Sequence, residues 1–201
     1  MLKQLKFEQQ KIEAIAQTPQ NTPGLQMLVE QAIPQATIML DQITKMIDIE
    51  AQLEATPGRK YLLGMTADVR GTLGLSLANI RGYLLTGNAD FKQNYEQLWE
   101  KNEAQFSDLT NNSTQLNYKQ SQAFKRLKEA RVIFASLAPR MLELRNQDNW
   151  NLANYWLATK AAPLGSQIKV ILKDMADNQA LLLAEDSLAI TDKAEKATTI
   201  S

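Results

Sequence analysis

Apolar residues recur every three or four positions along almost the whole chain, and this spacing constrains the fold more than any other feature. It places the side chains on one face of an α-helix. No stretch alternates apolar and polar residues as a half-buried β-strand does. The sequence therefore predicts an all-α protein, folded as an antiparallel up-and-down helical bundle. Two seams show the spacing most clearly: Leu62, Val69, Leu73, Leu77, Ile80 and Leu84, and then Leu127, Ala130, Phe134, Leu137, Met141 and Leu144.

Proline, glycine and asparagine divide this pattern into successive helices. Breaks are expected at 18–24, 56–58, Gly87 and 110–114, where these residues cluster. The last helix, which continues to near Asp192, spans about 45 residues and measures roughly 65–70 Å. It is longer than the two helices before it, so part of its apolar face needs other partners.

This excess length predicts one domain, residues 1–201, made of two stacked four-helix bundles that share long helices. One module is expected to comprise about 1–56 plus 172–195, and the other about 57–171. The alternative is a single bundle with an N-terminal helical hairpin packed on its side.

Composition excludes several classes of function. The chain has no Cys and no His, so thiol catalysis, Cys/His zinc sites and His-dependent catalytic dyads are excluded. Lys plus Arg and Asp plus Glu number 22 each, which leaves no basic surface for nucleic acid. Glu96, Glu100 and Glu103 lie near lysines on one predicted helix, as on a solvated face. We therefore expect no enzyme, no cofactor, no metal and no nucleic-acid partner.

One segment carries a resemblance. Ile80-Arg-Gly-Tyr-Leu-Leu-Thr-Gly-Asn-Ala-Asp-Phe91, followed by Tyr95, resembles the helix-turn-helix signature of the CHASE3 and four-helix-bundle sensor families. The stretch Trp150–Asp186 is similar to the final ectodomain helix of methyl-accepting chemotaxis receptors. The additional N-terminal helices look more like the helical bimodular arrangement of such receptors.

The resemblance implies the periplasmic domain of an inner-membrane protein, placed between two transmembrane helices and dimeric in the membrane. The module that contains the N-terminal helices would then be membrane-proximal, and the other membrane-distal. The chain itself has no apolar run of the length, about 18 residues, that a transmembrane helix needs. Met1–Gln10 is polar and amphipathic, unlike a signal peptide. A cytosolic coiled-coil adaptor is the alternative that this absence permits.

Three arginines recur at eleven-residue intervals: Arg59, Arg70 and Arg81. Eleven residues are close to three helical turns, so all three lie on nearly one face of a continuous helix. The planar guanidinium suits carboxylates, and receptors that this chain resembles bind organic acids through arginines. Solvated or intra-bundle salt-bridging arginines are the alternative interpretation.

The candidate ligand site comprises Arg70, Arg81, Tyr155 and Thr159. Tyr155 and Thr159 are one turn apart on the last helix, at a predicted height similar to that of Arg81. Pro163 removes the backbone hydrogen bond to the Thr159 carbonyl, so a proline kink with an ordinary aromatic belt is the competing interpretation.

The sequence thus predicts a chemoreceptor domain that binds a small anion, most plausibly an organic acid, and transmits a helix shift across the membrane. The sensor domain of a histidine kinase or cyclase is one alternative. Another is a docking or dimerisation scaffold without a small-molecule pocket.

Overall fold

The computed structural model describes residues 1–199, and the surroundings of side chains as far as residue 193. Every regular element within the described residues is helical, so the all-α prediction is confirmed. The chain forms two compact units. Residues 19–151 are called here the bundle unit. Met1–Thr18, together with the chain from Leu152 onward, is called the paired-helix unit.

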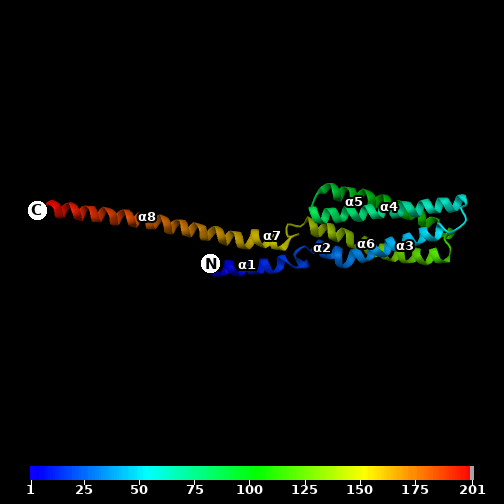
Figure 1. Cartoon of the computed structure of the whole chain (residues 1–201), viewed down its shortest axis with the longest axis horizontal. Coiled ribbons are helices and arrows are strands. Elements are labelled where there is room, and N and C mark those ends of the chain that lie inside the picture. The colour runs from blue at the N-terminus through cyan, green and yellow to red at the C-terminus, as the bar shows by residue number, and fades with distance from the viewer. Residues whose placement is uncertain (200–201) are drawn as a thin grey trace. The chain divides into compact units, whose positions relative to one another are not determined.

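The bundle unit is an antiparallel four-helix bundle. In Figure 1 its four long helices run side by side, with successive helices in opposite directions. α3 packs against α4 and α6, and α4 packs against α5. The elements are η1 (Pro19–Asn21), α2 (Pro23–Met27), η2 (Leu28–Ala32), α3 (Ile33–Glu50), α4 (Pro57–Thr86), α5 (Ala89–Asn111), η3 (Ser113–Gln115) and α6 (Tyr118–Asn146).

The predicted seams form the core of this unit. Their apolar side chains turn inward because burial of a Leu or Phe side chain contributes roughly 1.5–3 kcal/mol. α3 adds a seam of its own, with Met39, Ile43 and Met46 fully buried. Fully buried members of the two predicted seams are Leu62, Val69, Leu73, Ile80, Leu84, Leu127, Phe134 and Met141.

Local capping chemistry sets the helix ends. Gly87 ends α4 with φ 70°, in the left-handed region where glycine is favoured. Asn88 then caps α5, because its side chain accepts a hydrogen bond from the Asp90 backbone N–H. Asn117 and Gln120 cap α6 reciprocally in a capping box. The turn predicted at Gly87 is therefore confirmed.

Two prolines follow π-helical turns at the same spacing. η2 ends two residues before Pro34, and η4 (Leu157–Ala161) ends two residues before Pro163. In a regular α-helix each proline ring would clash with the carbonyl four residues earlier. The wider turn relieves that clash, and the Ile33 N–H donates to the Leu28 carbonyl, five residues back.

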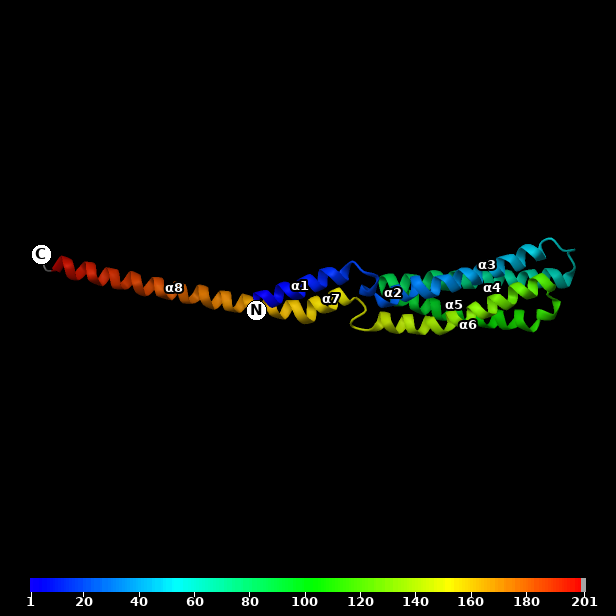
Figure 2. The same ribbon diagram turned by 90° about the horizontal axis from the view of Figure 1, so that it is seen from below.

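The paired-helix unit has much less core. α1 (Leu2–Ala16) packs along α7 (Leu152–Trp156), η4 and the start of α8 (Ala162–Thr199). Figures 1 and 2 both show α8 continuing well beyond the N-terminal end of α1. Ala153 and Ala161 are the buried apolar residues of this unit among those described.

The division of the chain differs from the one expected from helix lengths. α3 was predicted to lie beside 172–192, but it packs on α4 and α6 within the bundle unit. Residues 172–192 are exposed along their whole length. The reason is that α3 buries Met39, Ile43 and Met46 between two bundle helices. No described helix is both long enough and apolar enough to cross a membrane.

Candidate functional site

A groove in the bundle unit, lined by three helices and one exposed arginine, is the candidate site. Its volume is about 290 Å³, and its walls come from η2, α3, α4 and α6. Phe134 of α6 forms a fully buried floor, and Arg81 of α4 stands at the edge, exposed. The lining residues are Leu28, Ala32, Ile33, Ala36, Thr37, Leu40, Leu77, Ala78, Arg81 and Phe134.

The local sequence explains why space is left here. Ala32, Ala36 and Ala78 put short side chains where α3 and α4 face each other. The π turn that precedes Pro34 widens the helix at the Leu28 and Ala32 end. Such turns occur frequently at functional sites. A larger residue at the alanine positions would fill the groove.

Arg81 lacks a partner, unlike the other arginines of α4. Arg59 forms an ion pair of 3.1 Å with Glu50, and the Arg70 Nε donates to the Thr44 hydroxyl at 2.8 Å. Among the described residues, none forms a hydrogen bond or an ion pair with the Arg81 guanidinium. Its five N–H groups are therefore available to a carboxylate or another oxyanion.

The four predicted site residues do not all lie together. Arg81 lines the groove, and Arg70 does not. Eleven residues of helix separate their Cα atoms by about 16 Å, which is too far for one small ligand. Tyr155 and Thr159 belong to the paired-helix unit, where the Thr159 hydroxyl donates to the Tyr155 carbonyl at 2.7 Å.

Sequence reasoning missed the walls that come from residues 28–40. The sequence signal was Pro34, which indicates a local break but not a groove. The α3 face gives no separate sign, because its alanines are as common in tightly packed helices as in cavities.

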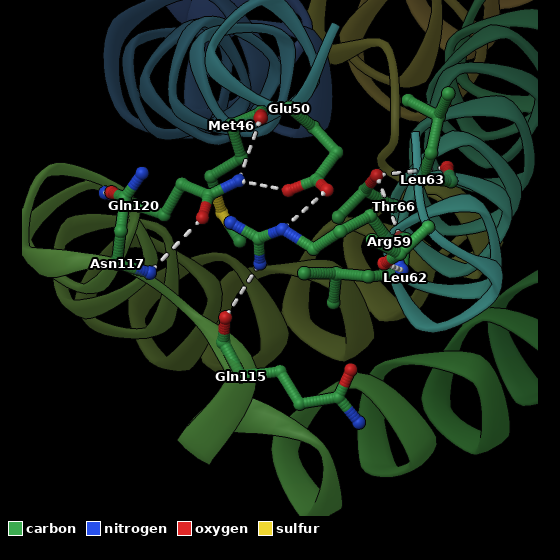
Figure 3. A network of polar contacts seen from close by, with 10 residues as sticks. Met46, Glu50, Arg59, Leu62, Leu63, Thr66, Gln115, Asn117 and Gln120 are labelled. Carbon is green, nitrogen blue, oxygen red and sulfur yellow. Dashed lines mark hydrogen bonds and ion pairs between the residues drawn. The ribbon is translucent and has the colours of Figure 1, made fainter. Parts of the chain in front are cut away.

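Arg59 belongs to a polar network at the opposite end of the bundle unit (Figure 3). Its guanidinium pairs with the buried Glu50 carboxylate and also donates to the Gln115 carbonyl at 2.7 Å. The Gln120 Nε2 donates to Glu50 at 2.6 Å and ties α6 to α3. This network compensates a buried charge and joins four elements. Its role is therefore structural, as in the alternative interpretation of the arginines.

A second polar layer crosses the middle of the core. Arg131 donates to Asn102 and to Glu103, and its guanidinium lies between the rings of Trp99 and Phe106. Burial lowers the pKa of Arg131, and Glu103 opposes that effect. Asn102 also donates to the Val69 carbonyl at 2.8 Å. Every polar group of this layer has a partner, so it favours one helix register over ligand binding.

No set of three or more acidic residues among the described residues is close enough to hold a metal ion. The groove also has no carboxylate in its lining, and thus no candidate general base. The groove thus offers apolar surface and one guanidinium, that of Arg81.

The family model for the CHASE3 domain matches residues 77–188, more than half of the chain. The chain belongs to the CHASE3 family. CHASE3 domains are helical extracellular sensor domains of signalling proteins such as histidine kinases and chemoreceptors. The comparisons found neither a matching curated protein nor a matching solved structure.

The CHASE3 match covers one side of the groove. It includes Leu77, Ala78, Arg81 and Phe134, while the lining residues of η2 and α3 lie before it. The resemblance predicted from Ile80–Phe91 is thereby confirmed at the level of the sensor family.

Proposed function

We propose that this CHASE3 domain is the periplasmic ligand-binding domain of a transmembrane chemoreceptor, and that it binds a small anion without catalysing a reaction. The observation that carries the proposal is Arg81, a cation without a partner beside an apolar groove. Membership in a family of extracellular sensors supports it.

A ligand in the groove would contact three helices at once. Arg81 and Ala78 come from α4, Thr37 and Ala36 from α3, and Phe134 from α6. A bound anion would draw these helices together, because the free energy of binding favours the packing that contacts it best. Packed helices change position in small discrete shifts, and such a shift is the proposed signal.

A homodimer is part of the same proposal. α8 carries apolar residues at intervals of three, four and seven, which fit the spacing of a two-stranded coiled coil. Leu164 and Ile168 are half-buried, and the later ones, from Ile171 onward, are exposed. A second copy of the chain could cover this face. The residues at this spacing are Leu164, Ile168, Ile171, Met175 and Leu182.

A thermal-shift screen tests the binding proposal directly. The panel contains organic acids, amino acids, purines and inorganic anions. A ligand at about 100 times its Kd stabilises the native state by roughly 2.7 kcal/mol, which raises the melting temperature by several degrees. The Arg81→Ala variant should lose this shift. Arg70→Ala, a matched loss of an arginine from the same helix, should keep it.

An empty screen would contradict direct binding and favour the docking scaffold instead. The protein sequence encoded before and after these residues tests the receptor type. We expect two flanking transmembrane helices followed by a methyl-accepting signalling domain. A kinase or cyclase domain in that place would contradict the chemoreceptor assignment and leave the sensor assignment intact.

A further inference from the structure

We infer that the ligand of the Arg81 groove is a monocarboxylate with a compact apolar body, such as an aryl-acetic or a branched aliphatic acid. This inference rests on the proposed function and narrows it from small anions in general to one chemical class. It excludes dicarboxylates and free amino acids as ligands of this groove.

The groove has a single charged side chain for a ligand. Arg81 is the one charged residue among the ten that line the groove. A guanidinium can hold one carboxylate with two parallel hydrogen bonds. The other polar lining residue is Thr37, whose hydroxyl already donates to the Ile33 carbonyl at 2.9 Å. A second ionised group on the ligand would find no counter-charge here.

The walls of the groove are mostly apolar. Eight lining residues are apolar, and several of them are buried, including Leu28, Ala32 and Phe134. A second carboxylate or an ammonium group against these side chains would lose its hydration without a compensating hydrogen bond. An aliphatic or aromatic body gains from the same surface.

The volume of the groove limits the size of the ligand. At about 290 Å³ the groove lies at the lower limit of small-molecule sites, which range over roughly 300–1,000 Å³. A compact ring or a branched chain fits this space, while a long fatty acid would extend out of it.

The test uses probes that differ in one property at a time. Phenylacetate and 4-methylpentanoate are compared with phenylacetamide and 4-methylpentanamide, which keep the body and lose the charge. Succinate and leucine add a second ionised group. Binding of each probe to the 201-residue chain is measured by isothermal titration calorimetry. We expect at least one monocarboxylate to bind, and its amide to bind about tenfold more weakly or worse.

Two pairs of variants locate the site. Arg81→Ala should weaken monocarboxylate binding about tenfold or more, whereas Arg70→Ala should not. Ala78→Phe should abolish binding by filling the groove. Ala67→Phe is the matched control, since Ala67 is also an exposed alanine of α4 but lies outside the groove. Circular dichroism confirms that each variant is folded.

The outcomes separate this inference from the proposed function. If succinate or leucine binds more tightly than both monocarboxylates, with the same dependence on Arg81, the chemical class is wrong and the sensor proposal stands. If monocarboxylates bind equally well to Ala78→Phe, the groove is not the site. If no probe and no anion of the wider panel binds in an Arg81-dependent way, direct binding at this site fails altogether.

Discussion

The two units share the same spacing of apolar residues, but these residues are buried in one unit and mostly exposed in the other. In the bundle unit, 25 apolar residues are buried in one continuous cluster. In the described part of the paired-helix unit, Ala153 and Ala161 are buried, while leucines of α8 are mostly exposed. Both regions carry apolar residues at three- and four-residue intervals.

The number of neighbouring helices accounts for this difference. α3 has α4 on one side and α6 on the other, whereas α8 packs against α1 near its start and residues 172–192 are exposed along their whole length. An amphipathic pattern predicts that a face will be covered, but it does not identify the partner. The helices of the bundle unit cover one another, whereas residues 172–192 of α8 stay exposed.

Truncation of one leucine in each unit tests this comparison with the largest expected effect. Leu127→Ala removes a fully buried side chain and should lower the free energy of unfolding by about 2–5 kcal/mol. Leu183 of α8 is 70% exposed, so Leu183→Ala should change it by less than about 0.5 kcal/mol. Urea unfolding followed by circular dichroism at low protein concentration measures both.

The same pair of variants can also break the comparison. A neutral Leu127→Ala would mean that the bundle core is not the main source of stability. A further variant, Leu182→Ala, lies on the apolar face proposed for the homodimer, where Leu182 is 60% exposed. If its destabilisation grows with protein concentration, a second copy covers α8.

Alanine substitution at two glycines should have opposite effects in the two units. Gly87 has φ 70°, and a Cβ there would collide with the guanidinium of Arg145. Gly87→Ala should therefore destabilise the bundle unit by at least about 1–2 kcal/mol. Gly165 is in the interior of a helix, with no neighbour within 4 Å of a Cβ, so Gly165→Ala should stabilise α8 by about 0.5–1 kcal/mol.

Thermal unfolding measures the first glycine variant, and amide hydrogen exchange in α8 measures the second. Destabilisation of α8 by Gly165→Ala would show that this face of α8 is closely covered, in contradiction to the exposed helix described here. A neutral Gly87→Ala would mean that the left-handed cap is not required for the α4–α5 turn.

Features that depend on neighbouring residues in the sequence could be predicted. The turn at Gly87 follows from a residue that tolerates positive φ, and burial of Leu73 and Phe134 follows from helical periodicity. Each of these features is determined within a few turns of one helix.

Features that depend on contacts between distant segments could not be predicted. Periodicity shows which face of α3 is apolar, but not that α4 and α6 cover it. For the site, the eleven-residue spacing placed Arg70 and Arg81 on one face of α4 but about three turns apart along it. Of the two, Arg81 lines the groove. The opposite wall, from Leu28 to Leu40, depends on which residues face Arg81 across the bundle.

A tyrosine in each unit gives a comparison that depends on pH and has no expected effect at neutral pH. Tyr95 of α5 is buried, and burial raises the pKa of its phenol above the usual value of 10.0. Glu103 and Glu96 raise this pKa further, while Arg131 opposes them. The unfolded chain therefore ionises Tyr95 first, and the stabilisation by the neutral phenol is fully present below pH 10 and lost as the pH rises above it.

The loss should approach about 1.4 kcal/mol for each pH unit above 10 until the folded protein ionises as well. In Tyr95→Phe this component disappears, so the variant should lose less stability than the parent between pH 10 and 11.5. Tyr155→Phe, at an exposed position of α7, is the control and should follow the parent. Urea unfolding at each pH measures the three proteins. If the stability of Tyr95→Phe and of the parent falls equally with pH, water reaches the phenol inside the bundle. The bundle unit would then be less closed than its buried core indicates, and its contrast with the exposed α8 would be weaker.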